Sequence, residues 1–428
     1  MTTMALVSRQ SEGRLRGSAA AVLRRRVGQE IQQAAITIPE RFFDFRNVSA
    51  MAWLRAYRPL AKLGARTVVV TRREDVLGVL ADSATYPSPY SEGLAGNFVL
   101  GLSGDDFARH RRVLDTVLDD ADLPRLEDLA GRVARARVDG ADPAGLAVGR
   151  EVVRPVLQST VADYLGLRRP DFVTLLSWSR AIFQDIFLNN SRLPYVHLAG
   201  VRAVEQLKAD VRAELEARRS EPTDRDDVLG RLLAMHETPG GDRFTEAEIV
   251  DSMVGLAIGW LWHGAKASLL AVDGLLERPE ALALAQQAAR SGDAERVRRV
   301  LWEALRFRPV QVGLPRTCPH DTRLAVGTPR ETEVPAGAFV LVGTHSAMWD
   351  DTAIPDPKDF DPTRADEQYL IFGRGDHRCM GESIIRRQLP AMLMPLLALD
   401  SLERVPGRRG RLSWAGPSPD DLRVRFRR

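Results

Sequence analysis

The pattern of apolar and polar positions predicts a long, buried helix in the middle of the chain. Thr245 and Glu248 have the spacing of a capping box, in which two side chains bond the free N–H groups of a helix start. The stretch from Met253 to Trp262 is apolar on nearly every helical face, which is typical of a helix that crosses a protein interior. Because Pro279 cannot continue a helix, the pattern ends there.

Most of the remaining pattern is also helical, with short β patches of branched residues. The helical pattern covers Arg73–Leu80, Asp105–Leu118, Leu146–Leu165, Phe172–Leu188, Val201–Arg219 and Glu295–Phe307. The β patches are Thr67–Thr71, Thr322–Val326 and Glu331–Val342, and Pro335-Ala336-Gly337 predicts a hairpin turn within the last. The sequence therefore predicts a mainly α fold with small β-sheets.

The composition indicates a single large domain. The chain has 428 residues, of which 44% are hydrophobic and 27% charged, an ordinary globular balance. Because no Pro/Gly/Ser-rich linker or internal repeat divides the chain, we expect one domain over residues 47–428. It follows an arginine-rich, partly helical segment over residues 1–46. That segment resembles a surface helix more than a targeting presequence.

Charge and cysteine content exclude several classes of function. A net charge of +3 does not favour a nucleic-acid partner. The two cysteines, Cys318 and Cys379, argue against a disulfide scaffold and a four-cysteine zinc site. No run of 18 apolar residues predicts a membrane span. We therefore expect a cytoplasmic protein.

The run from Phe372 to Gly381, FGRGDHRCMG, places a cysteine just before a predicted helix. Backbone N–H groups at a helix start favour a thiolate. Gly373 and Gly381 let the backbone approach a flat cofactor, and Phe372 shields the sulfur. A single thiolate placed in this way suits heme iron, because it donates electron density to the metal.

This run resembles the heme-binding loop of the cytochrome P450 family, F-G-x-G-x-H-x-C-x-G, at every fixed position. The resemblance implies a heme b cofactor over which the long central helix lies. It also implies that Cys379 is the iron ligand and that His377, Arg316 and Arg111 contact the heme propionates. Where the family has a histidine four residues before this arginine, the chain has Phe107.

The resemblance also implies a buried structural triad of Glu303, Arg306 and Arg364. Glu303 and Arg306 have the E-x-x-R spacing on one helix face, where a surface ion pair is the simpler alternative. Arg364 matches the arginine that the family places before the cysteine loop.

The central helix departs from the family at the residues that guide protons to dioxygen. Counting back from Pro279 aligns the family signature A-G-x-[D/E]-T with Gly259 to His263, so that Trp262 takes the acid position and His263 the threonine position. No acid or hydroxyl lies between Val254 and Lys266. Either ordered water relays protons instead, or His263 and Trp262 serve a different chemistry, with the histidine as acid or base.

The sequence thus predicts a heme-thiolate enzyme that oxidises a small, largely apolar metabolite in secondary metabolism. Two alternatives remain: O–O or N–O bond chemistry that is driven by peroxide or needs no oxidant, and a heme sensor or electron carrier. The expected partner is a ferredoxin or reductase. It would bind a basic face formed by Arg109, Arg112, Arg374, Arg378, Arg386 and Arg387. The pocket is expected to be lined by 86–98, 256–263, 310–314 and 414–417, with 183–195 as its lid.

Overall fold

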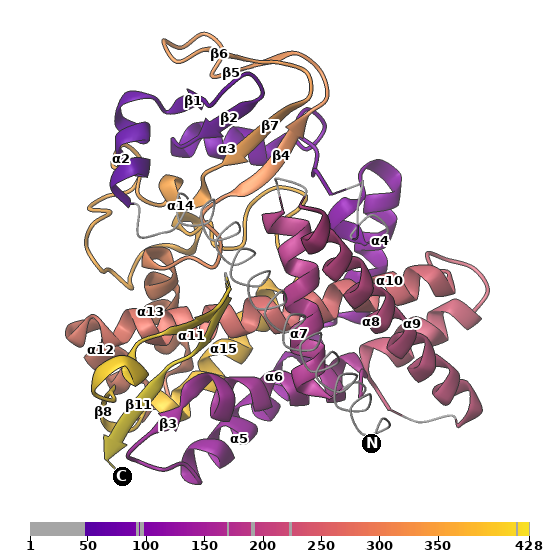
Figure 1. The fold of residues 1–428 in the computed structure, drawn as a ribbon, viewed down its shortest axis with the longest axis vertical. Helices are drawn as coiled ribbons and strands as arrows, with labels where there is room; N and C mark the ends of the chain where they lie inside the picture. The colour runs from indigo at the N-terminus through magenta and orange to yellow at the C-terminus, as the bar shows by residue number, and fades with distance from the viewer. Residues whose placement is uncertain are drawn as a thin grey trace, which may run out of the picture.

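Figure 1 shows the computed structural model, which describes residues 48–90, 94, 98–168, 171–189, 193–221, 225–416 and 418–427. The predicted N-terminal segment 1–46 lies outside these residues, as do parts of the predicted pocket lining and lid. Helices make up most of the described chain, and small sheets flank them, so the mainly α prediction is confirmed. The helices are α2 Val48–Tyr57, α3 Arg73–Ala81, α4 Gly104–Val117, α5 Leu123–Asp139, α6 Arg154–Thr160, α7 Phe172–Phe183, α8 Pro194–Ser220, α9 Val228–Glu237, α10 Glu246–Ile258, α11 Gly264–Leu276, α12 Pro279–Arg290, α13 Ala294–Phe307, α14 Thr344–Ala347 and α15 Glu382–Leu397.

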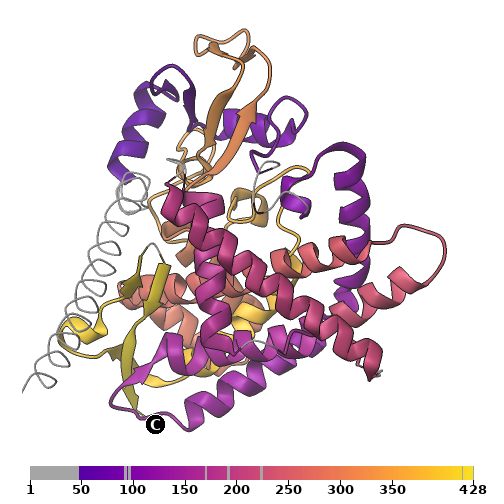
Figure 2. The same cartoon turned by 45° about the vertical axis from the view of Figure 1, so that its right-hand side comes forward.

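The strands form small sheets at the edges of the helical body (Figures 1 and 2). The largest has the order β1-β2-β7-β4, in which β2 and β7 are parallel and the other pairs antiparallel. The strands are β1 Leu60–Lys62, β2 Thr67–Val70, β3 Leu146–Ala147, β4 Leu314–Cys318, β5 Thr322–Leu324, β6 Thr332–Val334, β7 Ala338–Val342, β8 Asp400–Arg404, β9 Ser413–Ala415, β10 Ser418–Asp421 and β11 Arg423–Arg427.

The predicted hairpin over Glu331–Val342 is wrong, although the turn at Gly337 is present. Gly337 has a φ of 73°, a left-handed conformation that suits glycine. The strands on either side of it do not pair with each other. Instead β6 pairs with β5, and β7 pairs with β4 and β2. The turn therefore carries the chain from one sheet to another.

The central helix forms as predicted but is interrupted. The Thr245 hydroxyl accepts from the Glu248 N–H and the Glu248 carboxylate accepts from the Thr245 N–H, so α10 begins with a capping box. Between α10 and α11 a single π-helical turn spans Gly259–His263. This is the five-residue stretch that the sequence comparison had aligned with the family signature.

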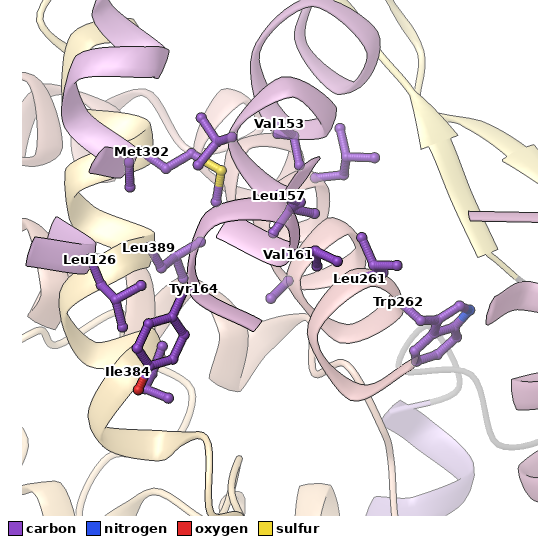
Figure 3. Close-up of a cluster of buried hydrophobic side chains, with 14 of the residues drawn as sticks. Leu126, Val153, Leu157, Val161, Tyr164, Leu261, Trp262, Ile384, Leu389 and Met392 are labelled. Atoms are coloured by element: carbon purple, nitrogen blue, oxygen red, sulfur yellow. The ribbon is translucent and has the colours of Figure 1, made fainter. Parts of the chain in front are cut away.

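A further correction concerns the predicted helix over Leu146–Leu165. Its first two residues form β3, because their backbones pair with Arg423 and Val424 of β11. The rest is helical, with π-helical turns on both sides of α6. Leu157 and Val161 from this segment pack with Leu261 of the central helix in the core cluster of Figure 3. Among the described residues, no helix is both long and apolar enough to cross a membrane.

Candidate active site

The loop that carries Cys379 ends at the first turn of α15. The Cys379 N–H donates to the Phe372 carbonyl at 3.0 Å, so the phenylalanine backbone anchors the cysteine. The Phe372 ring packs on that of Trp302 in α13, with 5.5 Å between ring centroids. These contacts fix the loop on the helical core.

Two glycines give this loop its shape. Gly373 and Gly375 both have a φ of 72°, which side chains with a Cβ rarely adopt. A Cβ on Gly375 would collide with the backbone carbonyl of Leu80, and one on Gly373 would lie 3.1 Å from Leu314. Gly375 and Gly373 therefore let the loop backbone pack closely against Leu80 and Leu314. Gly381 faces the sulfur, since a Cβ there would lie 3.8 Å from the Cys379 Sγ.

The surroundings of the Cys379 thiol act on its pKa in opposite directions. The cysteine is exposed as a residue, yet the protein packed around its sulfur removes hydration from the thiolate and raises its pKa. The Gly381 N–H, Arg111 and Arg378 favour the thiolate in return. A metal cation bound at the sulfur would favour the thiolate further, because the thiolate is the form that ligates metal.

Three cationic or basic side chains converge beside this loop, and we call Arg111, Arg316 and His377 the carboxylate-binding group. The Arg316 side chain is buried, and its Nε has no hydrogen-bond partner among the described residues. Burial, then the positive charges of Arg316 and Arg111, lower the pKa of His377 to about 4. Arg111 donates to the Arg378 carbonyl at 3.0 Å, which ties α4 to the loop.

This group fits the acidic edge of a heme. The Arg316 Nη1 donates to the Pro315 carbonyl at 2.9 Å, but a buried Nε–H that lacks an acceptor costs free energy, and two ionised carboxylates would supply acceptors to all three side chains. Phe107 occupies the position of the family histidine, and its ring lies 4.5 Å from that of His377.

On the central helix, His263 ends the π-helical turn. Its Nδ1 lies 3.2 Å from the Gly259 carbonyl and its Nε2 lies 3.4 Å from the Gln311 side-chain nitrogen. A carbonyl only accepts and an amide nitrogen only donates, so both contacts require the same tautomer, with the proton on Nδ1. Burial, and then the charge of Lys266, lower the pKa of His263 to about 4. At neutral pH its Nε2 is therefore a hydrogen-bond acceptor.

Trp262 lies beside His263 but is held by the core. Its ring stacks on Phe183 of α7 with 3.3 Å between centroids, and its Nε1 donates to the Ser418 hydroxyl at 2.7 Å. The Lys266 ammonium lies 4.6 Å from the ring centroid. In Figure 3 the ring lies at the far end of the core cluster from Leu389. These contacts suit a residue that orients the turn.

Glu303, Arg306 and Arg364 meet in the interior, as predicted. Arg306 and Glu303 are fully buried and joined at 2.7 Å, and the Arg364 Nε lies 3.3 Å from the same carboxylate. Tyr369 adds a hydroxyl donor to Glu303 at 3.0 Å. The remaining arginine N–H groups donate to backbone carbonyls between 348 and 359. Trp349, whose role had no sequence signal, covers the Arg306 guanidinium, with 5.1 Å between the Arg306 Cζ and the ring centroid.

Comparison with known proteins agrees with this arrangement. A family model for Cytochrome P450 matches residues 293–411. Nocardicin C N-oxygenase of Nocardia uniformis subsp. tsuyamanensis is 26% identical, over 83% of this chain and 87% of its own length. Mycinamicin IV hydroxylase/epoxidase of Micromonospora griseorubida is 28% identical, over 87% of this chain and 89% of its own length. The structure of cytochrome P450 TbtJ1 superposes with a TM-score of 0.76 at 21% identity, over 89% of this chain and 97% of its own. The chain belongs to the cytochrome P450 family.

Membership settles the broad chemistry. This P450 is a heme-thiolate oxidoreductase of the monooxygenase type, and its curated relatives are oxygenases of bacterial secondary metabolism. The predicted cytochrome P450 fold, with its long central helix, is confirmed.

Two further polar residues at the site were not singled out from the sequence. Gln311 contacts His263 from the segment between α13 and β4. Tyr90 has a buried hydroxyl near Arg316. Both lie in irregular segments without periodicity, so their side-chain directions had no sequence signal. Gln311 was within the predicted pocket lining 310–314, and Tyr90 within 86–98.

Proposed function

We propose that this P450 oxidises a small, largely apolar metabolite and that His263 replaces the acid/threonine pair on the distal side of the heme. The heme, when bound, supplies the oxidising chemistry, with Cys379 as its iron ligand. We propose heme b, bound without covalent links, because the chain has two cysteines and no C-x-x-C-H attachment motif. His377, Arg316 and Arg111 would hold its propionates, while Phe372, Gly373 and Gly381 would shape the loop at its proximal side.

The observation that carries the proposal is the protonation state of His263. With the proton fixed on Nδ1 by the Gly259 carbonyl, Nε2 offers a lone pair. A pKa near 4 keeps this imidazole neutral at pH 7. It therefore has no proton on Nε2 to donate, and it can accept a hydrogen bond from an O–H or N–H group of a substrate. Because a lowered pKa also weakens an imidazole as a base, it takes up a proton only as the substrate releases one. The usual acid/threonine pair, by contrast, delivers protons.

This difference favours a second candidate function beside ordinary monooxygenation. A site that delivers protons poorly suits peroxide-driven oxidation, because peroxide already carries the two electrons and the protons that dioxygen would need. It also suits a rearrangement or group transfer of a substrate whose own O–O or N–O bond reacts. His263 would then act as the base that removes or holds one proton.

The test compares His263→Ala with His263→Thr, which restores the hydroxyl of the family signature. We expect His263→Ala to keep heme and lose about 10²–10⁴-fold in rate, the usual worth of acid–base assistance. His263→Thr should improve NADPH-coupled dioxygen turnover relative to wild type, and peroxide should support the wild type better than NADPH does. Full activity of His263→Ala would refute the role, and ordinary monooxygenation would then be the better assignment.

We also propose an acidic ferredoxin or reductase as the electron donor when external electrons are used. The support is the predicted basic face, although its arginines are locally paired: Arg112 with Asp242, Arg378 with Glu382 and Arg386 with Asp366, each at 2.6 Å. Docking should show electron-transfer rates that fall with ionic strength and with Arg112→Glu. Rates insensitive to both would argue against this surface.

A further inference from the structure

The chain lacks one of the donors that the resemblance predicts for the carboxylate-binding group. The first position of the H-x-x-x-R pattern is Phe107, whose ring packs on His377 and has no hydrogen to donate. The packing is close, with 4.5 Å between ring centroids and a 54° angle between the planes. The site therefore keeps the shape of this position without its hydrogen bond.

Tyr90 carries a hydrogen-bond donor on a different segment of the chain from Phe107. Tyr90 is 9% exposed, and its hydroxyl is buried with no hydrogen-bond partner among the described residues. Its ring is fixed edge-on against Phe187, with 5.0 Å between centroids. A buried hydroxyl without a partner destabilises the fold, and most native hydroxyls avoid this state.

The Tyr90 segment runs beside Arg316, whose guanidinium has one N–H without an acceptor. The Arg316 Nε is also buried without a partner among the described residues. The Thr317 N–H donates to the Pro87 carbonyl at 3.0 Å, so the segment that carries Tyr90 is bonded to the strand residue next to Arg316, and the charge of each side chain acts on the pKa of the other. Burial outweighs this interaction and raises the pKa of Tyr90, so the phenol stays a neutral donor. Because both buried donors lack an acceptor and one of them is cationic, an anion is the favoured missing group. No carboxylate of the described chain bonds Arg316.

We propose that Tyr90 donates its hydroxyl hydrogen to a heme carboxylate, together with Arg316, and thereby replaces the donor that Phe107 lacks. The inference concerns heme retention and is independent of the role proposed for His263. It assigns Tyr90 to cofactor binding and not to the substrate pocket in which its segment was predicted to lie.

The experiment measures the rate at which the holoenzyme loses heme to excess apomyoglobin. Tyr90→Phe removes the hydroxyl and keeps the ring, and it should release heme about ten- to a hundredfold faster, the worth of one hydrogen bond to a charged group. Tyr86→Phe is the matched control, since Tyr86 is also buried, at 4% exposure, but packs in the cluster under the four-stranded sheet. It should release heme at the wild-type rate.

A second variant makes the replacement itself testable. Phe107→His restores the family donor, so adding it to Tyr90→Phe should slow heme loss again by a large part of the same factor. An unchanged rate in Tyr90→Phe would overturn the proposal. So would a Tyr90→Phe protein whose only defect is weaker binding of an apolar probe such as naphthalene, read from the Soret band.

Discussion

At the scale of single residues, the two thiols of the chain differ in what surrounds them. Cys318 is fully buried in β4, and its Sγ donates to the His320 carbonyl at 2.9 Å. Cys379 instead lies at the start of α15, where the Gly381 N–H and two arginines favour its thiolate. These environments support the proposed role of Cys379 in metal binding and a packing role for Cys318.

This difference leads to a spectroscopic prediction. The reduced carbon-monoxide complex of the wild type should show the red-shifted Soret band of thiolate ligation. Cys379→His should abolish that band because imidazole donates less electron density to iron. Cys318→Ala should retain it. Loss of the band in Cys318→Ala, with retention in Cys379→His, would contradict the assignment.

The site was predictable at this scale wherever residues followed a fixed spacing. The loop from Phe372 to Gly381 and the Glu303–Arg306 pair could be found because their geometry is local. Tyr90 and Gln311 could not, because their partners come from distant segments and nothing in the sequence fixes their direction. The protonation state of His263 likewise depends on burial, which the apolar pattern around it suggested but did not determine.

At the scale of elements, helix α13 carries arginine–glutamate pairs in contrasting environments. Arg306 and Glu303 are both fully buried. Arg306→Ala should lower the free energy of unfolding by about 3–5 kcal/mol, because the Glu303 charge would remain buried without its main partner. Urea unfolding of the holoenzyme would measure this change.

The same helix provides the control. Arg299 pairs with Glu295 at 3.0 Å, but the arginine side chain is 44% exposed. Because solvent screens such a pair, Arg299→Ala should change stability by less than about 0.5 kcal/mol. Equal effects of the two substitutions would mean that burial does not set the strength of the triad.

The elements that sequence reasoning placed correctly are those set by local signals. The capping box at Thr245 and the stop at Pro279 give the central helix its ends. The hairpin over Glu331–Val342 was wrong because strand pairing is decided by partners far along the chain. The π-helical turns had no signal, since one extra residue in a turn does not alter an apolar stretch that is buried on all sides.

At the scale of the whole molecule, a buried histidine links folding to pH. His345 is 3% exposed in α14, and its Nε2 has no partner among the described residues. Burial, then the charges of Arg306 and Arg55, lower its pKa to about 3. The unfolded chain, with a histidine pKa near 6.5, binds a proton that the folded protein does not. His345 therefore does not reduce the free energy of unfolding above about pH 6.5, and it reduces it increasingly as the pH drops toward 3.

His345→Asn should remove this dependence. At pH 5 the histidine costs about 2 kcal/mol of stability, from 1.36 kcal/mol per pH unit over about 1.5 units. The loss of unfolding free energy between pH 7.5 and pH 5 should therefore be smaller by about that amount in His345→Asn. His320→Asn, at an exposed position, should behave as the wild type. An unaltered pH dependence in His345→Asn would show that another group controls acid stability.

The π-helical turn Gly259–His263 also constrains how this helix can evolve. A π-helical turn holds about one residue more than an α-helical turn for nearly the same rotation, so it accommodates an extra residue without rotating the helix that follows. Deleting one residue within the turn should therefore restore a regular α-helix and leave Asp273 facing Arg308 and Arg404, the two arginines that it binds beyond the turn. A deletion between Gly264 and Asp273 would instead turn Asp273 by about 100° away from both arginines. Related chains should therefore differ in length by one residue at Gly259–His263 more readily than elsewhere between Thr245 and Pro279.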